Sequence, residues 1–221
     1  MQVVLGEILP LGVAVALSPL PIIAVLLLLV APVGVRGALL FLAARAVTLC
    51  ALVVIFALAS DLADDAAGSA TPAAILRIVV GSALLVGAVM KWRTRPRGAD
   101  EPKLPGWMRS VDNAGPAHAV RLGFLLTAAN VKEIAFAAGI GFTIGGAFLP
   151  WGQIAIAVAV FVVLACLSIA IPVAAALVGG DRVRPALAEM RNWLVRNNAI
   201  VVAIVLLVLG AMLVGSGITE L

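Results

Sequence analysis

The sequence has little of what soluble enzymes use. No tyrosine occurs among its 221 residues, and charged residues make up only 12%. A soluble protein of this length needs far more polar surface, so a soluble globular fold is excluded. A single histidine, His118, is too little for a His-based metal site or a hydrolytic triad. The two cysteines, Cys50 and Cys166, lie in apolar segments and form neither a metal-ligand pattern nor a disulfide framework. We therefore expect no enzyme activity, no metal and no cofactor.

Apolar residues are abundant instead. They make up 64% of the chain, and the mean hydropathy is +1.21, which indicates an integral membrane protein. The high content of Ala, Val, Leu and Arg fits a GC-rich bacterium, so we expect a multi-pass protein of the bacterial plasma (inner) membrane. Only helices satisfy the backbone of such spans in lipid. Six apolar segments are predicted to cross the membrane: 4–30, 37–60, 73–90, 122–147, 154–178 and 199–218.

Positive charge gathers in loops that share one predicted side of the membrane. Most of the 15 Lys and Arg residues fall within residues 91–121 or 182–196, and Arg36 lies in the first loop. Acidic residues occur in the second loop, on the opposite side, at residues 61–65. The positive-inside rule then makes the basic loops cytoplasmic, with both termini facing outward.

The chain divides into two halves with three predicted spans each. Residues 1–91 form the first half and residues 121–221 the second, joined by a basic cytoplasmic linker at residues 92–120. Because each half crosses the membrane an odd number of times, the halves run in opposite directions. The predicted fold is therefore all-α, with six transmembrane helices arranged as two inverted three-helix repeats.

One polar cluster interrupts an apolar segment. Asn130-Val131-Lys132-Glu133 lies in the middle of residues 122–147, close to the predicted bilayer midplane. A charge at that depth costs about 2.5–3.5 kcal/mol on insertion scales, so these side chains are not expected to face lipid. Arg45 lies at a similar depth in the second predicted span. The cluster should line a cavity, a polar pathway or a helix–helix contact.

Two interpretations of these charges stay open. In the structural one, Glu133 forms an ion pair with Arg45 or Lys132. In the functional one, Arg45 and Lys132 offer positive charge to a phosphate, sulfate or carboxylate of a substrate. Glu133 would then neutralise the empty site or carry a coupling proton. Both interpretations can hold at once, with the ion pair as the empty state of the site.

Two prolines interrupt the first predicted span. Ser18-Pro19-Leu20-Pro21 should break or kink the helix, because each proline lacks an N–H and clashes with the preceding turn. A packing kink is the simpler explanation. The break lies at the position in the first half that Asn130-Val131-Lys132 occupies in the second. This correspondence favours a transport site between two repeats, with Ser18, Pro19 and Pro21 as a gate.

These two motifs resemble the lysine exporter (LysE) superfamily. Ser18-Pro19-Leu20-Pro21 is similar to its Gly-Pro-x-Pro element and Asn130-Val131-Lys132 to its Asn-Pro-Lys element, with Ser18 and Val131 as departures. Within the superfamily the chain most resembles the GAP family of actinobacteria, the sulfolipid-1-addressing or glycopeptidolipid-addressing proteins. The resemblance covers essentially the whole chain and implies a role in moving cell-envelope glycolipids to the surface.

The expected function is transport of an envelope lipid or glycolipid by alternating access. The predicted substrate-binding residues are Arg45, Asn130, Lys132 and Glu133. Arg45 and Lys132 would engage the anionic headgroup, and Glu133 would respond to protons. The chain has no ATP-binding motif, so coupling would use an ion gradient, a substrate gradient or a partner. Two alternatives are an exporter of amino acids or other small solutes, and an accessory scaffold of a larger lipid-export complex. Membrane lipids are expected partners, a homodimer is plausible, and no nucleic acid is expected.

Overall fold

The computed structural model describes residues 2–60, 70–93, 111, 115–147 and 149–219, and these are helical apart from short turns. The chain forms two compact units. The first comprises Met1–Asp61 with Lys103–Trp193, and the second comprises Leu62–Pro102 with Leu194–Leu221. Each unit combines segments from both predicted halves, so the repeats stay a prediction. Most of the predicted linker lies outside the described residues.

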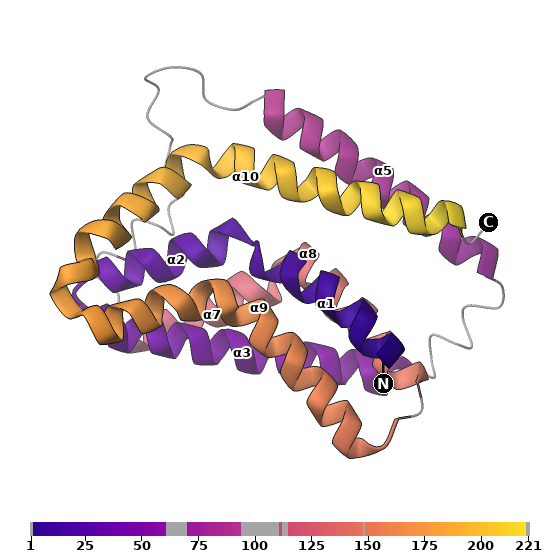
Figure 1. The fold of residues 1–221 in the computed structure, drawn as a ribbon, viewed down its shortest axis with the longest axis horizontal. Helices are drawn as coiled ribbons and strands as arrows, with labels where there is room; N and C mark the ends of the chain where they lie inside the picture. Colours follow the sequence, from indigo (N-terminus) through magenta and orange to yellow (C-terminus); the bar gives the residue numbers. More distant parts are fainter. Residues whose placement is uncertain (1, 61–69, 94–110, 112–114, 148, 220–221) are drawn as a thin grey trace. The chain divides into compact units, whose positions relative to one another are not determined.

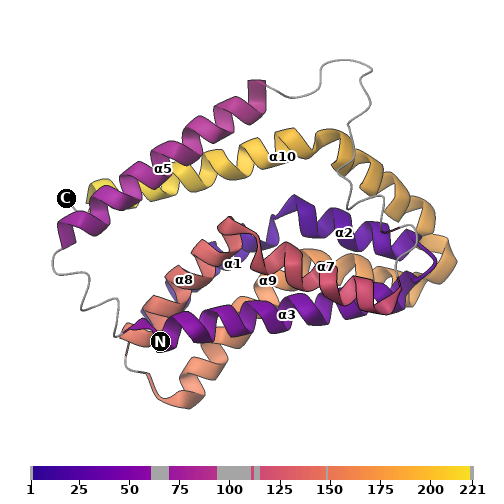
Figure 2. The ribbon, with the colours of Figure 1, turned by 180° about the vertical axis from the view of Figure 1, so that it is seen from behind.

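The first unit is built on two long helices that pack against helix pairs distant in sequence (Figures 1 and 2). Helix α3 packs against α7 and α8, while α9 packs against α1 and α2, and α3 and α9 also touch each other. The short helix η2 follows α9. Their bounds are α1 Gln2–Ala16, α2 Pro19–Val30, α3 Gly34–Leu58, α7 Pro116–Ala128, α8 Val131–Gly146, α9 Trp151–Gly179 and η2 Gly180–Val183.

Both helix pairs are broken helices. The axis bends by 48° between α1 and α2, which confirms the predicted break at Ser18–Pro21. The backbone of Ser18 is extended. Pro19 then starts α2, a position that suits proline because an N–H group in the first helical turn has no intrahelical acceptor. Between α7 and α8 the axis bends by 67°, and Asn130 is again extended there. This second break was not predicted from the sequence, and Figure 2 shows the two helices meeting at an angle.

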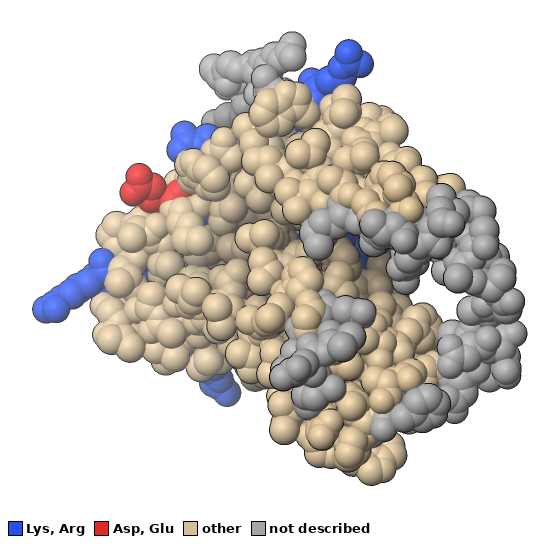
Figure 3. Space-filling view, turned by 45° about the vertical axis from the view of Figure 1, so that its right-hand side comes forward, with Lys and Arg blue, Asp and Glu red and all other residues tan. Residues whose placement is uncertain are grey.

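Several helices are long and apolar enough to cross a membrane. Within the described residues, α3 meets this criterion, as does the stretch Trp151–Val208, and each broken pair meets it if counted as one span. The structure therefore supports two to four spans. The six-span topology and its orientation stay predictions. On the face seen in Figure 3, few of the described atoms belong to charged residues, as expected of a surface that contacts lipid.

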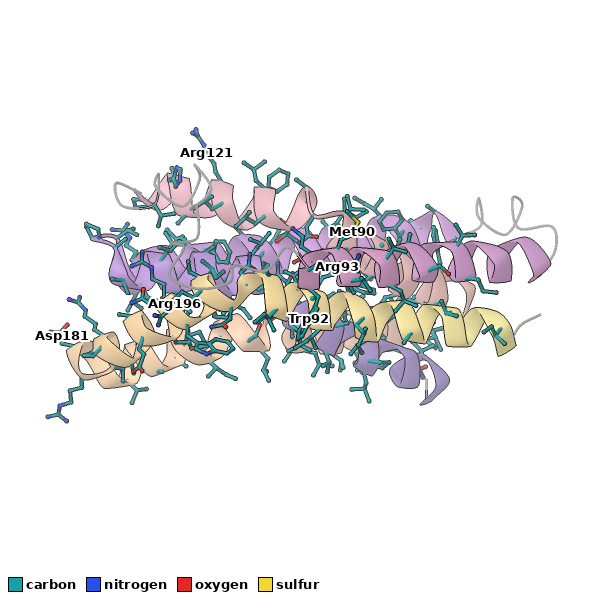
Figure 4. All side chains as sticks on the ribbon, turned by 90° about the horizontal axis from the view of Figure 1, so that it is seen from above. Met90, Trp92, Arg93, Arg121, Asp181 and Arg196 are labelled. Atoms are coloured by element: carbon teal, nitrogen blue, oxygen red, sulfur yellow. The ribbon has the colours of Figure 1, made fainter. Side chains whose placement is uncertain are left out.

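The segment expected to be a loop at residues 182–196 is mostly helical. Helix α10 spans Arg184–Thr219 and begins well before the predicted sixth span. The first turns of α10 contain a run of good helix formers and bury Leu187. These two features explain why the helix begins earlier than predicted. At its start, Arg184 and Asp181 form an exposed ion pair at 3.2 Å. Asp181, like Arg121 on α7, points away from the helices in Figure 4.

The second unit contains α5 (Ala70–Arg93) and the end of α10. Gly81 and Gly210, which occupy corresponding places in the predicted third and sixth spans, let these two helices approach closely. A Cβ added to Gly210 would lie 2.8 Å from the Gly81 carbonyl oxygen. The pairing of the two glycines therefore sets this helix contact.

Glycines also set the contact between α8 and α3. A Cβ at Gly141 would lie 2.8 Å from the Val53 carbonyl oxygen, and one at Gly145 would meet Ala57 and Ser60. This Gly-x-x-x-Gly pair therefore allows the two helices to approach closely. The glycines are used within the unit, so they give the predicted homodimer no support.

Gly141→Ala should lower the free energy of unfolding by about 1–3 kcal/mol, because the added methyl group would push α8 away from α3. Gly139→Ala on the same helix is the matched control, since its added Cβ has nothing within 4 Å. The control should be neutral or stabilising through helix propensity. Thermal unfolding in detergent measures both, and equal midpoints for the two variants would contradict the packing described here.

Candidate functional site

A buried ion pair joins α3 to α8 in the first unit. The Arg45 Nη1 atom lies 2.7 Å from Glu133 Oε2, and both side chains are almost completely shielded from solvent, at 1% and 0% exposure. Nη1 also donates to Thr127 Oγ1 at 3.2 Å. The ion pair of Glu133 with Arg45, one of the two pairings expected from the sequence, is therefore present.

The break between α7 and α8 places Glu133 for this contact. Asn130 caps α8: its Oδ1 accepts the Lys132 backbone N–H at 3.2 Å. Its Nδ2 donates to Glu133 Oε1 at 3.4 Å. Glu133 occupies the first turn of α8, where the helix dipole favours a negative charge. Asn130 therefore caps the start of α8, and Glu133 in the first turn supplies the carboxylate of the ion pair.

Lys132 has a different partner. Its Nζ donates to the Ala14 carbonyl oxygen at 2.9 Å, in the last turn of α1, and lies 5.9 Å from the Phe136 ring centroid. A positive charge is favoured at a helix C-terminus, where carbonyl groups lack intrahelical donors. Lys132 therefore caps the helix that the first break terminates.

Every carbonyl in the last turn of α1 has a donor. Ala14 accepts from Lys132, and Ala16 accepts from Ser168 Oγ on α9 at 2.6 Å. The Val13 and Val15 carbonyls accept the backbone N–H groups of the two residues that follow the helix, at 3.0 and 3.1 Å. A break inside a membrane is tolerated only when the freed backbone groups find such partners. The predicted break is therefore satisfied by side chains from α8 and α9.

Further polar side chains surround the ion pair. Ser18, at the first break, lies beside the Glu133 carboxylate, and Cys166 of α9 lies beside the Arg45 guanidinium. Both are buried. The Arg45 Nε atom has no hydrogen-bond partner within the described part of the chain. A buried guanidinium with an unused donor retains the capacity to bind a further acceptor.

The structure brings together most of the residues predicted to form the site. Ser18, Arg45 and Glu133 are buried at the centre, and Asn130 and Lys132 are half-buried beside them. The predicted gate prolines, Pro19 and Pro21, lie buried in the first turn of α2, where they shape the backbone and offer no donor.

Sequence reasoning missed three members of the cluster: Thr127, Cys166 and Ser168. Each is a small residue in an apolar helix, a pattern that also suits ordinary packing. No group of three or more His, Cys, Asp or Glu that could hold a metal occurs among the residues searched, which are those described.

A family model described as "Sap, sulfolipid-1-addressing protein" matches residues 8–219, which include every residue of the cluster. This is the family that the two motifs predicted. No curated protein and no solved structure gives a significant match.

Proposed function

The chain belongs to the Sap, sulfolipid-1-addressing protein, family, and from this premise we propose that it is a transporter of the bacterial plasma membrane. Its substrate is an envelope lipid or glycolipid with an anionic headgroup. The family description supports a lipid, and the term sulfolipid supports a sulfur oxyanion as the headgroup charge. The helices that are apolar enough to span a membrane support the location. The proposal includes membership of the wider lysine exporter superfamily, which would support a transport mechanism.

The observation that carries this proposal is the buried Arg45–Glu133 pair between two broken helices. Breaking a buried pair by removing one partner costs about 3–5 kcal/mol, so Arg45 needs an anion beside it at all times. In the empty protein Glu133 is that anion. In the loaded protein the headgroup takes its place, and Arg suits such oxyanions because its guanidinium donates in a planar fork.

Glu133 then responds to protons. When a headgroup anion occupies Arg45, a second negative charge in the same buried site would be repelled, and a proton on the Glu133 carboxyl group removes it. Asn130 and Ser18 remain beside the carboxyl group to hydrogen-bond its protonated form. Arrival of an anion and of a proton would therefore be coupled, which gives transport an ion gradient to use.

The two breaks supply the moving parts. Each long helix packs against a broken pair from the other half of the sequence, as inverted repeats would do. Lys132 and Ser168 hold the end of α1 through single hydrogen bonds to Ala14 and Ala16. Releasing these bonds would let the first break open as a gate, and Lys132 would turn to the headgroup. A larger lipid-export complex and a homodimer stay predictions.

Reconstitution of the purified chain alone into liposomes tests the function. Three probes are compared: a fluorescent lipid with a sulfated headgroup, a zwitterionic lipid with the same acyl chains, and radiolabelled lysine. We expect the sulfated lipid to cross faster than in protein-free liposomes and faster than the zwitterionic one, with no lysine flux. Lysine flux without lipid movement would instead identify a small-solute exporter. No flux of any probe from folded protein would identify a scaffold.

A further inference from the structure

A large apolar cavity lies within the first unit, and Arg45, Glu133 and their hydrogen-bond partners are not among its lining residues. Its volume is about 700 Å³, and it is lined by α3, by α9 and by Gly145 of α8. This volume is within the range of ligand pockets, about 300–1,000 Å³. One wall runs from Cys50 on α3 to Ser60, just beyond the end of that helix, and the α9 wall runs from Trp151 to Val162.

The walls are mostly apolar and offer few groups to a polar ligand. Ser60 already donates its hydroxyl group to the Ala57 carbonyl oxygen at 2.8 Å, and Trp151 as a whole residue is 79% exposed. Cys50 contributes a thiol, which is a weak donor. The remaining lining residues are aliphatic or glycine. A sugar or a charged group bound here would lose most of its hydrogen bonds to water without replacement, whereas a hydrocarbon would lose none.

The cavity and the charged cluster follow one another along the same two helices. Ile154, Val158 and Val162 line the cavity at four-residue intervals on α9. Cys166, the next position on that face, lies beside Arg45. On α3, Cys50 follows Arg45 by about 7.5 Å of helix rise. A ligand that reaches both places needs a charged end and an apolar end.

We propose that the cavity holds an acyl chain of the lipid whose headgroup binds at Arg45, a subsite that rests on the proposed function. The lining helices are those apolar enough to span a membrane, so lipid hydrocarbon surrounds them at high concentration. A docking helix is a poorer occupant, since 700 Å³ holds fewer than about two turns of a helix that is about 10 Å wide. The acyl chain therefore adds apolar binding energy and restricts the substrate to lipids.

Photo-crosslinking tests the subsite. The probe is a lipid with a sulfated headgroup and a diazirine near the end of one acyl chain, and labelled peptides are mapped by mass spectrometry. We expect adducts concentrated in residues 50–60, at the end of α3 and just beyond it, and in residues 151–162 of α9. Ala159→Phe and Ala155→Phe fill the cavity from α9. Each should lower adduct yield about tenfold, the effect of losing the contacts of about two methylene groups. Ala174→Phe, also exposed on α9 but outside the cavity, is the size-matched control.

The outcomes separate the subsite from the function. Adducts spread evenly over the lipid-facing helices, or equal yields from Ala159→Phe and Ala174→Phe, overturn the subsite even when wild-type protein moves lipid. Concentrated adducts that Ala159→Phe removes support the subsite even if the reconstituted chain gives no flux. In that case the lipid is bound and not transported, and only the proposed function fails.

Discussion

Arg45→Met is expected to destabilise the protein by about 3–5 kcal/mol, because it leaves the Glu133 carboxylate buried without its partner. Glu133→Gln should also destabilise, since it leaves the guanidinium without an anion. The double variant Arg45→Met with Glu133→Gln removes both charges and should recover most of the lost stability. Chemical unfolding of the four proteins in detergent gives the coupling free energy.

The reason for recovery is the cost of desolvation. Two charged groups lose more hydration free energy on burial than two neutral groups do, so replacing both with neutral groups is often tolerated. Met has nearly the length of the arginine stem, and Gln keeps an amide beside Asn130. If the two single losses simply add in the double variant, Arg45 and Glu133 do not interact as described.

Lys132→Met is expected to weaken the apparent affinity for an anionic lipid by about tenfold or more, the size of one lost hydrogen bond to a charged group. It should also cost some stability, because the Ala14 carbonyl oxygen loses its donor. Flux in liposomes at several lipid concentrations measures the affinity, and thermal unfolding measures the stability. Wild-type affinity from a folded Lys132→Met protein would remove Lys132 from the binding site.

Ser168→Ala is the matched control for this substitution. It removes the other side-chain donor at the end of α1, the hydrogen bond to Ala16, without removing a charge. Both variants should lose a similar amount of stability. Only Lys132→Met should lose affinity for the anionic lipid. If both lose it equally, the effect comes from the shape of the break and not from the charge.

The first break could be predicted because its cause is local. Pro19 and Pro21 lack backbone donors wherever the chain places them, so Ser18–Pro21 had to interrupt a helix. The second break also carries a local signal. Asn130 three residues before Glu133 is a helix-start pattern, and reading it as an N-cap would have located the start of α8. This N-cap signal was not recognised because the surrounding segment is apolar and was read as one continuous span.

The partners of the charges were only partly predictable. That Glu133 needs a cation follows from burial energetics, and Arg45 was one of two candidates in the membrane segments. Which cation it is depends on α3 packing against α8 through Gly141 and Gly145, a tertiary fact. The pairing of Lys132 with a backbone carbonyl group of α1 is tertiary as well. No pattern in either segment specifies it, because any apolar residue can supply the carbonyl oxygen.

The extent of α10 was mispredicted for another reason. Charge density at residues 182–196 suggested a loop, but membrane topology rules use charge to locate water and say nothing of backbone conformation. A basic segment at a membrane surface can be helical when it buries residues such as Leu187 and Leu194. The helix therefore continues beyond the apolar stretch.

The central claim is that the Arg45–Glu133 pair is the empty state of an anion site and not only a structural contact. The most direct test is flux of a sulfated lipid in liposomes that contain only this protein, with the double variant Arg45→Met, Glu133→Gln beside the wild type. The account predicts a double variant that unfolds like the wild type and yet moves the lipid no faster than protein-free liposomes. A stable double variant with wild-type flux would show that the pair only holds α3 to α8, and would contradict the account.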